Sequence, residues 1–152
     1  MPAERRAAAA ELFWADRQSA EQQVEACATI ATQMKFRAKS VLGLPIEKKT
    51  RYLVTLPQVS DQVAARALVN YHLGLKRPMM GDFLDALGIA HDEGLIKDET
   101  VVKPDSDKLK TAAAQIAAKY PTEDVGLYFS TLISQDPETW GELAELPQTA
   151  TA

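Results

Sequence analysis

The sequence has few of the residues on which most metal and redox sites depend. Its 152 residues include one cysteine and two histidines, so a disulfide within the chain is excluded. His72 and His91 belong to no His-Glu-x-x-His or Glu-x-x-His motif, the patterns typical of zinc and di-iron sites. We therefore predict no metal and no cofactor. We interpret His72 as bonded to backbone at a helix end and His91 as the cap of a turn.

Long apolar runs and an excess of positive charge are also absent. No apolar run approaches the ~20 residues that a membrane helix needs. Arg5 and Arg6 precede an alanine run, but Glu11 ends it too early for the core of a signal peptide. A net charge of −4 argues against general attraction to nucleic acid or anionic membrane. We expect a cytoplasmic protein whose partners include neither nucleic acid nor membrane.

Helix-forming residues are abundant, and the eight prolines divide them into segments. Proline disrupts the interior of a helix but is tolerated at its first turn. The segments between the prolines carry helical periodicity, and no alternating strand of useful length is evident. The sequence predicts an all-α fold, a single domain of about seven helices.

The predicted domain has a long N-terminal helix on which two three-helix units pack. Within each unit the second helix begins alike, with Pro, a capping Ser or Thr, an acid and Val, at Pro57 and again at Pro121. The similarity suggests an internal repeat, although cap residues alone would also produce it. The predicted segments are a long helix kinked near Asp16 (1–43), the first unit (45–89), an irregular connection (90–104), the second unit (105–147) and a disordered tail (148–152).

One apolar stripe predicts the buried face of the long helix. Its members recur at alternating spacings of three and four residues, and the stripe ends at Gly43. Cys27 lies within it, where a cysteine is normally an unreactive small apolar side chain. The stripe consists of Ala20, Val24, Cys27, Ala31, Met34, Ala38 and Val41.

The stretch from Tyr71 to Phe83 predicts a corner between two helices. Gly74 is expected to end the first helix and Pro78 to begin the second. Tyr71, Met80 and Phe83 should then meet in the core, with His72 at the exposed edge. Met79 and Met80 fit a core equally well as an adaptable groove for a partner, with Arg77 at its rim.

Charge is distributed unevenly along the chain. Six basic residues and one acid lie between Lys35 and Arg51, whereas residues 121–152 hold six acids and no base. Lys48, Lys49 and Arg51 occupy a first helical turn, where cations are disfavoured. They are therefore better candidates for a function than the basic residues before Gly43, although a solvated face explains them too.

No phosphate-binding loop, catalytic serine motif or paired carboxylates are evident. We predict a non-enzymatic protein that acts through protein–protein contact or self-association, with no catalytic residues. The alternative is a ligand-binding protein or enzyme with a pocket near the 71–83 corner and the 90–104 loop. Candidate contact residues are His72, Arg77, Met79, Met80, His91, Lys48, Lys49 and Arg51.

Overall fold

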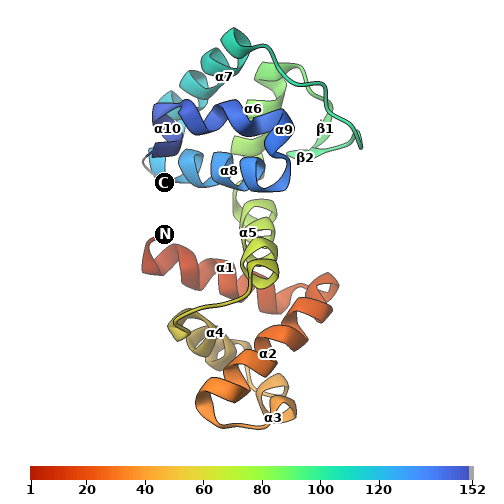
Figure 1. The fold of residues 1–152 in the computed structure, drawn as a ribbon, viewed down its shortest axis with the longest axis vertical. Coiled ribbons are helices and arrows are strands. Elements are labelled where there is room, and N and C mark those ends of the chain that lie inside the picture. The colour runs from red at the N-terminus through yellow and green to blue at the C-terminus, as the bar shows by residue number, and fades with distance from the viewer. Residues whose placement is uncertain (151–152) are drawn as a thin grey trace. The chain divides into compact units, whose positions relative to one another are not determined.

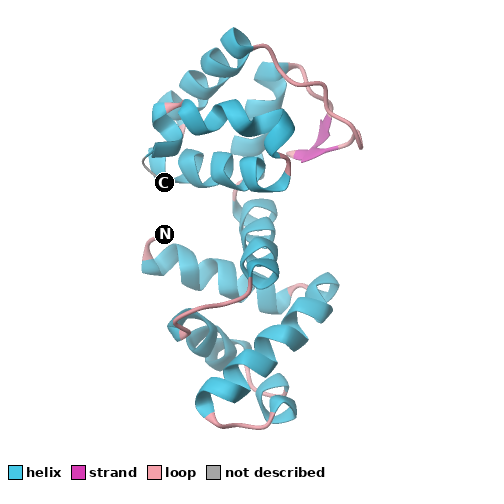
Figure 2. Cartoon of the chain, viewed as in Figure 1, coloured by secondary structure: helices cyan, strands magenta, loops and turns pink. Residues whose placement is uncertain are grey.

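The computed structural model describes residues 1–150 and confirms the all-α prediction (Figures 1 and 2). One two-stranded hairpin accompanies the helices in this range. No helix in it is both long and apolar enough to span a bilayer. The elements are α1 (Ala3–Ala15), η1 (Arg17–Ser19), α2 (Ala20–Met34), α3 (Ala38–Leu42), α4 (Ile46–Thr55), α5 (Asp61–Leu75), α6 (Arg77–Leu87), β1 (His91–Asp92), β2 (Leu95–Ile96), α7 (Ser106–Lys119), α8 (Thr122–Gln135), α9 (Pro137–Trp140), η2 (Gly141–Glu145) and α10 (Pro147–Ala150).

The chain divides into two compact units, Met1–Gly74 and Leu75–Ala152. The boundary falls inside the 45–89 segment that the sequence groups as one unit, and it separates α5 from α6. The expected contact of Tyr71 with Met80 and Phe83 stays a prediction. The organisation as a single domain and the internal repeat also stay predictions.

The N-terminal unit begins with a broken helix. The predicted kink near Asp16 is confirmed, since α1 ends at Ala15 and Asp16 has an extended backbone. A continuous helix up to Gly43 is wrong, because α2 ends at Met34 and Lys35 takes the left-handed conformation with φ 57°. A non-glycine residue adopts this conformation at a helix C-terminus without an obvious sequence signal.

The core of the N-terminal unit differs in part from the predicted stripe. Cys27, Ala31 and Val41 are buried as expected. The predicted burial of the other four members is wrong, because they are exposed: Ala20, Val24, Met34 and Ala38. α2 turns a neighbouring face inward, and α1 packs on α4. The buried residues of this core are Ala10, Phe13, Trp14, Ala26, Cys27, Ile30, Ala31, Val41, Leu53 and Val63.

The C-terminal unit is held together by aromatic rings. α6 packs on α7, and α8 contacts α9, η2 and α10. Phe83 of α6 lies with its ring centroid 5.0 Å from Phe129, 5.8 Å from Tyr128 and 6.0 Å from Trp140. Burial raises the pKa of the Tyr128 hydroxyl, which keeps it neutral.

The start of the 90–104 connection is a tight hairpin rather than an irregular segment. His91 pairs with Ile96 and Asp92 with Leu95, in antiparallel register. Glu93 and Gly94 form the turn with φ 48° and 88°, the sign of φ that two-residue hairpins favour. The sequence did not predict this hairpin, because Glu-Gly is a weaker turn signal than Asn-Gly or Asp-Gly.

The tail predicted to be disordered is ordered where the structure describes it. Residues 148–150 belong to α10, and the Thr149 hydroxyl donates to the Leu143 carbonyl at 2.6 Å. Residues 151 and 152 lie outside the described residues. Pro147 begins this short helix, as prolines at the first helical position commonly do.

Candidate functional site

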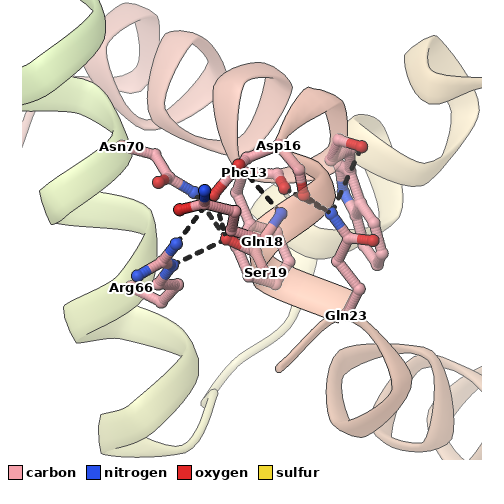
Figure 3. Close-up of polar contacts among 8 residues, drawn as sticks. Phe13, Asp16, Gln18, Ser19, Gln23, Arg66 and Asn70 are labelled. Atoms are coloured by element: carbon pink, nitrogen blue, oxygen red, sulfur yellow. Dashed lines mark hydrogen bonds and ion pairs between the residues drawn. The ribbon is translucent and has the colours of Figure 1, made fainter. Parts of the chain in front are cut away.

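A polar cluster joins the start of α2 to α5 in the N-terminal unit (Figure 3). Arg66 and Asn70 lie four residues apart on α5 and therefore on the same face of the helix. Arg66 Nε donates to the Ser19 hydroxyl at 2.7 Å, and Asn70 Nδ2 donates to the same oxygen at 3.0 Å. Arg66 Nη2 lies 2.9 Å from Asp16 Oδ2. Nothing in the local sequence predicted this cluster, because its two halves are about fifty residues apart.

The Ser19 hydroxyl uses its full hydrogen-bonding capacity within this cluster. It accepts from Arg66 and Asn70 and donates to Asp16 Oδ2 at 2.6 Å, one donor and two acceptor positions in all. Ser19 makes no side-chain cap of α2, because its hydroxyl is engaged with these three residues. Asp16 instead accepts from the Gln18 amide at 3.0 Å.

The Asp16 carboxylate is stabilised in its charged form. The hydrogen bond from Ser19 lowers the pKa of Asp16, the Gln18 amide and Arg66 lower it further, and partial burial opposes them. The charge of Arg66 is therefore balanced by an ionised carboxylate at neutral pH.

Gln23 closes the other side of this junction. Its Nε2 donates to the carbonyls of Phe13 at 2.7 Å and Asp16 at 2.8 Å. The end of α1 leaves the Phe13 carbonyl without a helical partner, and the Asp16 carbonyl also accepts from the Ser19 amide at 3.2 Å. A polar residue therefore turns toward the core here, which explains why the stripe based on apolar spacing alone was out of phase.

A hollow of about 340 Å³ lies beside Arg66 and Asn70. Its apolar wall comes from Leu12 and Ala15 of α1 and from Leu73 of α5. Gly74 belongs to the same wall, and a β-carbon there would come within 2.8 Å of Leu12 Cδ1. The remaining lining residues are Asp16 and Gln18.

The three basic residues at the start of α4 do not share one environment. Lys48 is exposed, and Arg51 lies 3.6 Å from Glu47 on the same helix face. Lys49 is buried, with its Nζ 4.9 Å from the centre of a Trp14 ring and 3.4 Å from the Leu42 carbonyl. Lys49 therefore belongs to the packing of the unit, and a solvated face describes only the other two.

Cys27 is buried in the same core, as predicted. Burial raises the pKa of its thiol, and the nearby charge of Lys49 opposes this shift. The thiol is thus held in its neutral, weakly nucleophilic form.

The residues from Met34 to Lys48 combine exposed apolar side chains with basic ones, and we call them the 34–48 segment. Met34, Phe36, Leu42 and Ile46 are between 40% and 48% exposed. Lys35, Arg37, Lys39 and Lys48 are also exposed. None of these four cations makes an ion pair with any residue that the structure describes.

The predicted 71–83 site residues are largely packed into the two units. His72 is only 3% exposed, so its expected place at an exposed edge is wrong, because α5 continues past it to Leu75. The predicted backbone bond is present, since His72 Nδ1 donates to the Leu68 carbonyl at 2.8 Å. Met79 and Met80 are buried, in agreement with a core role.

The side chains of Arg77 and His91 both form hydrogen bonds with the backbone of the hairpin turn. Arg77 Nη1 donates to the Glu93 carbonyl at 3.1 Å. His91 Nδ1 accepts from the Gly94 amide at 3.0 Å, as the predicted turn cap, so the ring proton lies on Nε2 and points to Asp85 at 2.7 Å. Since both nitrogens are in use, His91 cannot act as a base or ligand without opening the turn.

A second hollow, of about 400 Å³, follows the connection after the hairpin. It is lined by residues 87–90 and 98–105 with Lys108, and by none of residues 71–83. The alternative of a ligand pocket at the 71–83 corner stays a prediction. Across residues 1–150, no group of three or more His, Cys, Asp or Glu side chains is arranged to hold a metal ion. No protein-family model, curated protein or solved structure matches the chain.

Proposed function

We propose that the protein acts by self-association, in which the 34–48 segment of one copy binds acidic C-terminal residues of a second copy. The observation that carries the proposal is the composition of this segment. Exposed apolar side chains stand among four cations that have no ion-pair partner in the described chain. Burying these apolar side chains against a partner would supply about 1 kcal/mol each, since they are half-exposed already.

Charge complementarity favours a second copy as the partner. Residues 121–152 carry six acids and no base. Asp124 is paired with Lys76 at 3.0 Å and Glu142 with Lys103 at 2.9 Å. Asp136, Glu138 and Glu145 form no ion pair within residues 1–150. We name these three the acidic C-terminal residues. In a reciprocal dimer the acidic C-terminal residues of each copy would contact the 34–48 segment of the other, so the same contact would form twice.

A charge exchange tests the proposal directly. The first variant carries Lys35→Glu, Lys39→Glu and Lys48→Glu, and the second carries Glu138→Lys and Glu145→Lys. Each variant alone should sediment as a monomer, because its 34–48 segment and its substituted or native C-terminal residues then carry charge of the same sign. An equimolar mixture should form a heterodimer, since the opposite charges are restored across the interface.

Wild type should approach the dimer mass as its concentration rises, and high salt should reverse this because exposed charges are screened. Phe36→Ser should weaken the dimer, whereas Val24→Ser, at a position that is 59% exposed outside the segment, should not. A monomer at every concentration and salt level would overturn the proposal. Monomers in the mixture of the two variants would also overturn the proposal. Salt-sensitive binding to an anionic vesicle or to another protein, in place of a second copy, would overturn it as well.

A further inference from the structure

We propose that the hollow beside Arg66 and Asn70 binds a neutral amide group that carries a short branched apolar chain. The site lies in the N-terminal unit and shares no residue with the 34–48 segment. The inference is therefore independent of self-association.

The first observation is that the side-chain oxygen of Asn70, a hydrogen-bond acceptor, has a fixed orientation. Ser19 must donate its single proton to Asp16, because a carboxylate offers no proton in return. Ser19 can then only accept from Asn70, so the amide nitrogen of Asn70 faces Ser19 and its oxygen faces the other way. In Figure 3 no dashed line leaves that oxygen, and Asn70 is itself 9% exposed and lines the hollow.

The second observation is a donor beside this acceptor. Arg66 uses Nε for Ser19 and Nη2 for Asp16. Its remaining nitrogen, Nη1, makes no hydrogen bond within residues 1–150. Nε of Arg66 and Nδ2 of Asn70 share the Ser19 oxygen, and both residues line the hollow, so the free donor and the free acceptor belong to neighbouring side chains.

A donor next to an acceptor matches an amide, which offers a carbonyl oxygen and an N–H in the same plane. A carboxylate fits less well, since the Asn70 oxygen would face it without a proton between them. The charge of Arg66 is moreover balanced by Asp16 at 2.9 Å. An alcohol can bond to both groups only where they converge on one oxygen, whereas an amide reaches them with two separate atoms.

The wall of the hollow sets the apolar part of the ligand. Leu12, Ala15 and Leu73 present aliphatic surface, and Gly74 adds none. About 340 Å³ is near the lower limit of small-molecule sites. A chain of four or five carbons attached to the amide fits this size and chemistry.

The site is organised before a ligand arrives. Arg66 and Asn70 are held by hydrogen bonds on their inner sides, so few side-chain rotations remain to be lost on binding. The same chemistry could come from a free small amide or from the main chain of a peptide. Isovaleramide represents the first source and N-acetyl-leucine N-methylamide represents the second.

Nitrogen-15 NMR titration tests the proposal on the full chain. Asn70 is the chain's single asparagine, so its side-chain NH₂ signals are assigned by their loss in Asn70→Ala. Isovaleramide should shift these signals and the Arg66 Nε–H signal in a saturable way, with a dissociation constant on the order of millimolar. Isovalerate should bind at least about fivefold more weakly, and 3-methylbutanol should produce no saturation.

Variants show whether the shifts come from this site. Asn70→Ala and Arg66→Lys should each weaken isovaleramide binding at least about fivefold, followed at Arg66 or at the Leu12 methyl groups. Gly74→Ala should weaken it as well, by displacing Leu12, while both polar side chains remain. Gln62→Ala, exposed elsewhere on α5, is the matched control and should bind as wild type does.

Equal binding of the amide and the alcohol would overturn the inference, as would an absence of saturable shifts in the folded wild type. Stronger binding of the peptide analogue than of isovaleramide would identify a peptide as the source. The reverse order would identify a free amide.

Discussion

The replacement of Phe83 by alanine tests the aromatic core of the C-terminal unit. Phe83 is 0% exposed, and three aromatic rings lie with centroids within 6.0 Å of its own. Loss of a buried phenylalanine side chain costs about 3–5 kcal/mol of unfolding free energy. Contacts between aromatic rings add roughly 0.5–1.5 kcal/mol beyond burial, so we expect a value in the upper half of that range.

The two tryptophans make the measurement specific to one unit. Trp14 lies in the N-terminal unit and Trp140 in the C-terminal unit, beside Phe83. Urea unfolding followed by fluorescence in a Trp14→Phe background therefore reports on the C-terminal unit. Leu95→Ala, at a position in the same unit that is 52% exposed, is the control and should cost under about 1 kcal/mol.

A loss this large approaches the whole stability of a small unit. Phe83→Leu should therefore be measured alongside, since its smaller cavity gives an intermediate cost. A cost for Phe83→Ala no greater than that for Leu95→Ala would refute the described core.

Three further predictions concern the N-terminal unit. Cys27, which is 2% exposed, should react with a thiol reagent only after denaturant is added, and Ala31→Leu should cost about 1–3 kcal/mol by overpacking; fast labelling or a neutral Leu variant would contradict the packing of α2. Lys49→Glu should destabilise the unit by at least about 2 kcal/mol in thermal unfolding, because it removes the contact with Trp14 and buries a carboxylate, whereas Lys48→Glu should be nearly neutral; equal effects would be inconsistent with the burial of Lys49. Because the folded-state pKa of Asp16 is lowered, its contribution to stability should be present above the unfolded-state pKa of about 3.9 and lost as the pH falls below that value. The stability difference between wild type and Asp16→Asn should therefore shrink from pH 7 to pH 3. A constant difference would exclude the Asp16 carboxylate as the source of the pH dependence.

The sequence predicted the helices better than it predicted which faces they bury. Gly74 and Pro78 placed the end of α5 and the start of α6 to within one residue, because backbone restriction acts locally. The left-handed Lys35 has no such local cause, and its break divided the predicted long helix. The burial of Val24 was wrong for a tertiary reason, since Gln23 turns inward to reach α1 carbonyls.

The candidate sites were predictable only where charge or apolar character is local in sequence. The basic run around Lys48 was evident from composition, but the burial of Lys49 depends on Trp14, thirty-five residues earlier. The Arg66–Asn70 site could not be predicted, because its chemistry arises from the pairing of α5 with Asp16 and Ser19. An Arg-x-x-x-Asn spacing on a helix is in itself too common to indicate a site.

The bonds from Arg66 and Asn70 to Ser19 and Asp16 also have a consequence for the order of folding. They connect residues 47 to 51 positions apart, and the closure of so long a loop costs entropy before any contact offsets it. We expect this junction to form after the barrier, when α1 and α4 have already packed. In stopped-flow measurements, Arg66→Ala should then accelerate unfolding and leave the refolding rate nearly unchanged. The junction would thus slow the unfolding of the unit without contributing to the rate at which the unit folds.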